Sequence, residues 1–111
     1  RGARWSILNQ LEAAITRDFG GPEDFERVLT HALRRACGGR VLLSLMADGA
    51  LWLTGTKDPD ITFGTVLLDL TAPVVLCSEE SLALRVRVID WRRCARCYEE
   101  ALAQQADRSA P

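Results

Sequence analysis

The spacing of apolar residues changes at Gly38-Gly39, and that change limits the folds open to this chain. Before Gly38-Gly39 the apolar residues recur at the spacing of amphipathic helices. After these glycines they alternate, which is typical of strands. The sequence therefore predicts amino-terminal helices followed by a sheet, with a last helix after the strands. Its 111 residues provide room for a single domain, 1–111, with a core over about 5–105, and the polar ends suggest a module of a longer chain.

Two helices are predicted at the amino end. The first covers residues 5–19 and ends at Gly20-Gly21. The second begins at Pro22, because proline fits the first turn of a helix, and ends before Gly38-Gly39. Its apolar stripe consists of Phe25, Val28, Leu29, Ala32, Leu33 and Ala36.

Five strands and a last helix are predicted to follow. The strands are expected over residues 40–47, 50–55, 61–70, 74–77 and 82–89, with a short helical turn over 79–84 as an alternative. Asp48-Gly49 indicates a two-residue turn that pairs Met46 with Leu51 and Leu45 with Trp52. Short turns favour antiparallel pairing of consecutive strands, and Asp90 is a natural cap for the helix over 91–102. The predicted fold class is a two-layer α+β domain of order α-α-β-β-β-β-β-α.

The strands over residues 41–70 are apolar on both faces, and this observation bears most on function. Three helices can cover one face of a five-stranded sheet but seldom both. We therefore expect an apolar sheet face or the first helix to bind a protein partner or a second copy of the chain. The predicted interface residues are Trp5, Leu42, Met46, Leu51, Trp52 and Leu53. The alternative is that the first helix crosses to the second face and closes a three-layer core.

The four cysteines indicate a reducing compartment. Three of Cys37, Cys77, Cys94 and Cys97 lie within regular apolar patterns, which favours free thiols in an intracellular protein, nuclear or cytoplasmic. Cys94 and Cys97 have the spacing of a zinc or redox pair, but no second pair completes a set of four ligands. We expect both to be small core residues and predict no metal site.

The sequence contains little that would support catalysis. His31 is the only histidine, and it lies beside the apolar stripe of a helix, which is typical of a solvated or interfacial residue. We find no nucleophile elbow, no glycine-rich phosphate loop and no zinc-protease motif. The prediction is a non-enzyme with no catalytic residue, no cofactor and no small-molecule substrate.

Five arginines form a basic cluster in a chain whose net charge is -1. They are Arg85, Arg87, Arg92, Arg93 and Arg96. The stretch from Arg92 to Arg96 resembles the Lys-Lys-x-Ala-Lys start of the second helix in double-stranded RNA-binding domains, over five residues only. This resemblance implies phosphate contacts, whereas the residues alone are also consistent with a solvated face or an acidic partner.

These observations together predict an intracellular protein-interaction module, a scaffold or adaptor subunit of a larger complex. Nucleic-acid binding through the arginine cluster is the alternative. No apolar run approaches the ~20 residues that cross a bilayer, so we expect no membrane partner.

Overall fold

The computed structural model describes residues 9–36, 38–58, 60–72 and 79–109, and its elements follow the order α-α-β-β-β-α-α. The helices are α2 (Asn9–Phe19), α3 (Pro22–Arg35), α4 (Glu79–Arg87) and α5 (Trp91–Ser109); the strands are β1 (Arg40–Leu45), β2 (Leu51–Thr56) and β3 (Thr65–Thr71). Within the described residues there are three strands, so the prediction of five strands and one carboxyl-terminal helix is wrong. Residues 74–77, predicted as a strand, lie outside the described residues.

Most of the segment predicted as the last strand is helix α4. Leu82 and Val86 lie one helical turn apart and are buried, whereas Leu84 and Val88 are 58% and 81% exposed. A strand would place all four side chains on one face, so this burial pattern follows the helical period instead. Acidic residues at the start of α4 and arginines in its last turn also suit the helix dipole. The alternative of a helical turn over 79–84 was the better prediction.

The first strand of the sequence lies in the middle of the sheet. The strand order is β2-β1-β3, and β1 pairs antiparallel with both neighbours. Strands β2 and β3 therefore run in the same direction on either side of β1. We expected consecutive strands to pair, which is correct for β1 and β2 but wrong for β2 and β3. The connection over residues 57–64 must instead travel the length of β1.

The hairpin turn has three residues instead of the predicted two. The Met46 N–H donates to the Ala50 carbonyl at 2.8 Å, and the Gly49 N–H donates to the Met46 carbonyl at 2.9 Å. Gly49 has φ 91°, the left-handed conformation that completes a type I turn with a bulge. The resulting pairs are Leu45 with Leu51, Ser44 with Trp52, Leu43 with Leu53 and Leu42 with Thr54.

This one-residue shift reverses the two faces of β2, because neighbouring residues of a strand point to opposite sides. Leu51 and Leu53 join Leu43 on the face that the helices cover, and Trp52 lies beside Ser44 on the other face. The predicted register is therefore wrong at each pair, and the predicted apolar face that combined Leu51 with residues of the opposite side does not form.

The core lies between the helices and one face of the sheet, and Phe25 is at its centre. Phe25 is fully buried, with edge-to-face ring contacts to Phe19 at 5.0 Å and to Trp91 at 5.6 Å between centroids. These three rings connect the end of α2, the start of α3 and the start of α5. As predicted, Pro22 opens α3 and the Asp90 carboxylate caps α5 by accepting from the Arg93 N–H at 3.1 Å.

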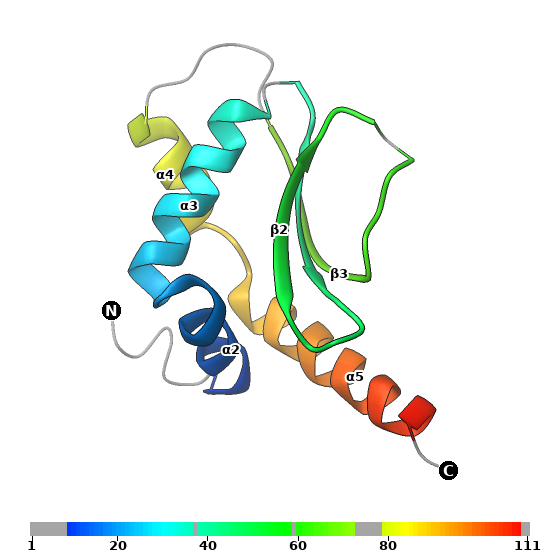
Figure 1. Cartoon of the computed structure of the whole chain (residues 1–111). Helices are drawn as coiled ribbons and strands as arrows, with labels where there is room; N and C mark the ends of the chain where they lie inside the picture. Colours follow the sequence, from blue (N-terminus) through cyan, green and yellow to red (C-terminus); the bar gives the residue numbers. More distant parts are fainter. Residues whose placement is uncertain (1–8, 37, 59, 73–78, 110–111) are drawn as a thin grey trace.

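The other face of β1 is covered by the chain's own connection between β2 and β3. Leu42 is fully buried on this face although it is not part of the helix-side cluster. The Arg40 guanidinium donates to the Ile61 carbonyl at 3.3 Å, and the rings of Phe63 and Trp52 lie 6.4 Å apart. Figure 1 shows α3 on one side of the strands and this connection on the other. The described part of the first helix, α2, packs into the helix-side cluster through Leu11, Ala14 and Ile15 and does not cross to the second face, where Leu42 is already buried.

Gly64 determines how closely the connection approaches β1, which leads to a test. Gly64 has φ 54°, and a Cβ added there would collide with the backbone carbonyl of Leu45. We expect Gly64→Ala to lower the free energy of unfolding by about 1–3 kcal/mol, measured by urea denaturation. Thr62→Ala, at an exposed position of the same connection, should change it by less than about 0.5 kcal/mol. Equal effects of the two variants would contradict this account.

Candidate protein-binding groove

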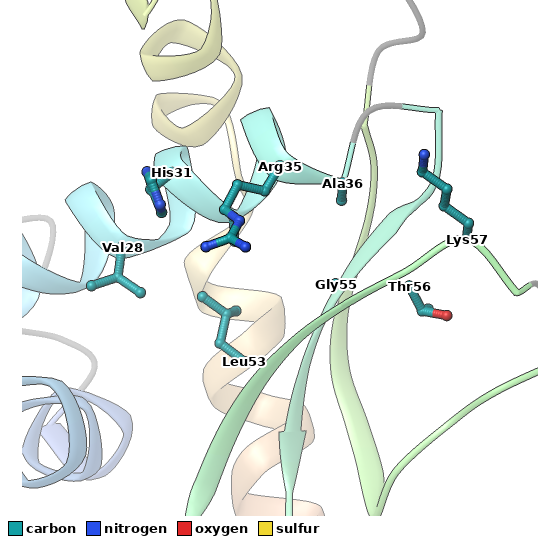
Figure 2. A pocket seen from close by; sticks show the side chains of 9 residues that line it. Val28, His31, Arg35, Ala36, Leu53, Gly55, Thr56 and Lys57 are labelled. Atoms are coloured by element: carbon teal, nitrogen blue, oxygen red, sulfur yellow. The ribbon is translucent and has the colours of Figure 1, made fainter.

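A groove of about 450 Å³ lies between α3 and β2 (Figure 2). Its lining residues are Val28, His31, Ala32, Arg35 and Ala36 from α3 and its carboxyl end, and Leu53, Gly55, Thr56 and Lys57 from β2 and the residue after it. The helical residues recur at the spacing of a single helix face. Gly55 contributes no side chain, and a Cβ placed there would lie 3.4 Å from the Ala36 Cβ. The missing side chain at Gly55 therefore leaves the groove open.

Strand β2 forms one edge of the sheet, and alternate residues along it direct their backbone N–H and C=O groups outward from this edge. Hydrogen-bonded and non-bonded pairs alternate along an antiparallel ladder, and Met46 with Ala50 is a bonded pair. The register therefore directs the N–H and C=O groups of Leu51, Leu53 and Gly55 away from β1. No strand among the described residues pairs with this edge.

The carboxyl end of α2 closes one end of the β2 edge. The Asp18 carboxylate accepts the Leu51 N–H at 2.9 Å, and the Arg17 guanidinium donates both to Asp18 at 2.8 Å and to the Gly49 carbonyl at 2.9 Å. The hydrogen bond from Arg17 lowers the pKa of Asp18, and the backbone hydrogen bond from Leu51 adds to this. The outward N–H of Leu51 is thus already satisfied by a carboxylate, whereas Leu53 and Gly55 lie beyond its reach along the strand.

The two edges of the sheet differ in how they are protected. Natural edge strands commonly carry charges, proline or a bulge that prevents pairing with another chain. Strand β3 has a register shift opposite Leu43 and Ser44, and it carries Asp69, which is ion-paired with Arg40 at 2.8 Å. Strand β2 has no charged residue, no proline and a regular register. The β2 edge is therefore the better template for an added strand.

The groove has an apolar floor and a positively charged rim. Arg35 points from α3 toward Leu53, and Lys57 stands beyond the end of β2 (Figure 2). Both cations are exposed, and His31 lies on the same side of α3. None of the nine lining residues has a carboxylate. The groove is therefore locally cationic in a chain whose net charge is -1.

Of the predicted interface residues, the structure places Leu53 alone in this groove. Leu42 and Leu51 are buried within the chain, Met46 is half-buried, Trp52 is 49% exposed on the opposite face of the sheet, and Trp5 lies outside the described residues. Sequence reasoning missed Gly55, Arg35 and Lys57 as site residues. The spacing of Val28, Ala32 and Arg35 on one helix face could have indicated a shared surface, but the position of β2 beside it could not be read from the sequence.

The five arginines of the predicted basic cluster are exposed, but they do not share one face. Arg85 and Arg87 lie on α4, where residues two apart point about 200° from each other. Arg92, Arg93 and Arg96 lie on α5. The formation of α4 in place of a strand therefore divides the predicted patch.

The described cysteines form neither a disulfide nor part of a metal-binding group. Burial raises the pKa of the Cys94 thiol to about 11, so this thiol stays protonated. Cys94 and Cys97 are both free thiols. Among the residues that the structure describes, no group of three or more histidine, cysteine, aspartate or glutamate side chains could hold a metal ion. Cys37 and Cys77 lie outside them.

Comparison with known proteins leaves the groove as the main guide to function. No protein-family model matches the chain, and no curated protein matches its sequence. In the part of the chain that the structure covers, none of the helices combines the length and apolar character needed to cross a membrane.

The contact between Asp18 and Leu51 predicts a specific pH dependence. Because the folded-state pKa of Asp18 is lowered, its contribution to stability is present above the unfolded pKa of about 4 and is lost as the pH falls through the folded value. We expect Asp18→Asn to lower the free energy of unfolding by about 1 kcal/mol near neutral pH, with the difference from wild type shrinking below about pH 4. Asp107→Asn, at an exposed position of α5, is the control. A pH-independent difference for Asp18→Asn would exclude this role of the carboxylate.

Proposed function

We propose that this chain is a non-catalytic protein-interaction module, a scaffold or adaptor subunit, that takes up a segment of a partner protein in the groove between α3 and β2. The observation that carries the proposal is the uncharged, regular edge of β2, which lies beside a hollow with an apolar floor. Edges of this kind are used for strand addition by peptide-binding domains, in which the main chain provides affinity and the side-chain pockets provide specificity.

Two further features support binding of a segment rather than chemistry. The groove contains exposed cations and a single imidazole but no carboxylate, so a general acid and base are not paired there. The Cys94 thiol, which stays protonated, lies outside the groove lining. The floor residues Val28 and Leu53 offer apolar contact area to a partner side chain.

We also propose an intracellular location, nuclear or cytoplasmic, since Cys94 and Cys97 are free thiols in the fold. Alkylation of the purified protein without reduction, followed by peptide mass mapping, should label both residues after unfolding. Recovery of either one in a disulfide from cells would contradict this location.

The proposed function is tested by selection from a phage-displayed library of random peptides of about 12 residues against the immobilised domain. We expect enriched peptides with micromolar affinity that compete with one another for one site. Gly55→Leu, which directs a side chain into the groove, should weaken their binding by tenfold or more, measured by fluorescence polarisation.

Thr54→Leu is the matched control, because it introduces the same side chain at the neighbouring residue, which points to the opposite face. Val28→Glu provides a second groove variant at an exposed helix position and covers the case in which Gly55→Leu fails to fold, as judged by circular dichroism. Failure to enrich any peptide, or enriched peptides that bind all variants equally, would overturn the proposed function.

A further inference from the structure

We infer that the occupant of the groove is an extended acidic segment that pairs with β2 as an additional strand, with a carboxylate side chain near Gly55 and an apolar side chain near Leu53. This inference rests on the proposed function and adds the conformation and the chemistry of the partner segment.

The backbone of β2 favours an extended occupant over a helical one. The outward N–H and C=O groups of Leu53 and Gly55 are two residues apart, the repeat at which a neighbouring strand offers its own groups. At the adjacent outward position, the Leu51 N–H is held by the Asp18 carboxylate. Asp18 thus ends the open part of the edge, and the paired stretch of the partner centres on three residues opposite Leu53, Thr54 and Gly55.

The faces of β2 determine which side chains of that stretch enter the groove. Residues opposite Leu53 and Gly55 share the helix-side face with them, and the residue between points to the face of Thr54. The position beside Leu53 meets an apolar wall that includes Val28 and Ala32. The position beside Gly55 has open space, because no side chain of this chain fills it.

Charge determines which side chain suits the position beside Gly55. This end of the groove contains Arg35, Thr56 and Lys57, and none of the lining residues is acidic. An aspartate or glutamate of the partner there would meet two cations without an opposing carboxylate, whereas a lysine would be repelled. Antiparallel pairs are slightly more stable than parallel ones, so we expect the acidic residue to precede the apolar one by two positions.

The experiment uses three synthetic peptides with acetylated and amidated ends and glycine-serine flanks. The first has the central sequence glutamate-threonine-valine. The second has lysine in place of the glutamate, and the third has the reversed central sequence valine-threonine-glutamate. We expect the first to bind at least tenfold more tightly than the second, with affinity that falls as salt is added. Arg35→Glu with Lys57→Glu should reverse this preference, and Arg92→Glu with Arg96→Glu, which also removes basic charge but on α5, should leave it unchanged.

Amide hydrogen exchange distinguishes strand pairing from other modes of binding. The amide protons of Leu53 and Gly55 should become protected when the first peptide or a groove-dependent library peptide binds, while Thr54, already bonded to β1, should change little. Library peptides that depend on the groove but lack acidic residues, or that leave these two protons unprotected, would overturn this inference while the proposed function stands. Absence of any groove-dependent peptide would contradict both this inference and the proposed function. Loss of binding in the α5 variant instead would assign the contact to the arginines.

Discussion

The burial of β1 on both faces is the constraint on which the rest of the structure depends. Five of its six residues are buried, so each side must be covered by something. Helices cover the side of Leu43, and the connection between β2 and β3 covers the side of Leu42. This arrangement places β1 in the centre of the sheet and leaves β2 at an edge, next to α3. The groove is thus a consequence of how the chain hides its most apolar strand.

Helices α2, α3 and α5 were predictable because local signals specify them, whereas α4 was not. Pro22 and the glycines on either side of α3 mark its limits, and Asp90 marks the start of α5. The strand count was wrong because the apolar spacing at Leu82 and Val86 fits a helix as well as a strand, and burial alone distinguishes the two. Local patterns therefore determine where elements begin, while ambiguous spacing needs the tertiary contacts to resolve it.

Local sequence patterns could not predict the register of β2 or the groove between α3 and β2. One additional turn residue before Gly49 exchanges the faces of β2, so an apolar surface inferred from Leu51 and Leu53 became part of the core. The groove depends on α3 lying beside β2, elements whose contact no sequence spacing specifies. The strands are indeed apolar on both faces, but the chain itself covers the second face. It does so mainly with the connection between β2 and β3, which the sequence pattern predicts as a polar loop followed by part of a strand.

The lengthwise connection between β2 and β3 also constrains the order in which the molecule assembles. Strands β1 and β2 are joined by a tight turn, and hairpins of this kind close in microseconds. Strand β3 pairs with β1 at greater chain separation, which costs more loop-closure entropy and slows its docking. The hairpin can therefore exist before β3 arrives, and in that interval β1 has an unpaired edge as well. Docking of α2 through Asp18 occupies the Leu51 end of β2 only, so until β3 pairs with β1 the hairpin presents open backbone groups at both of its edges.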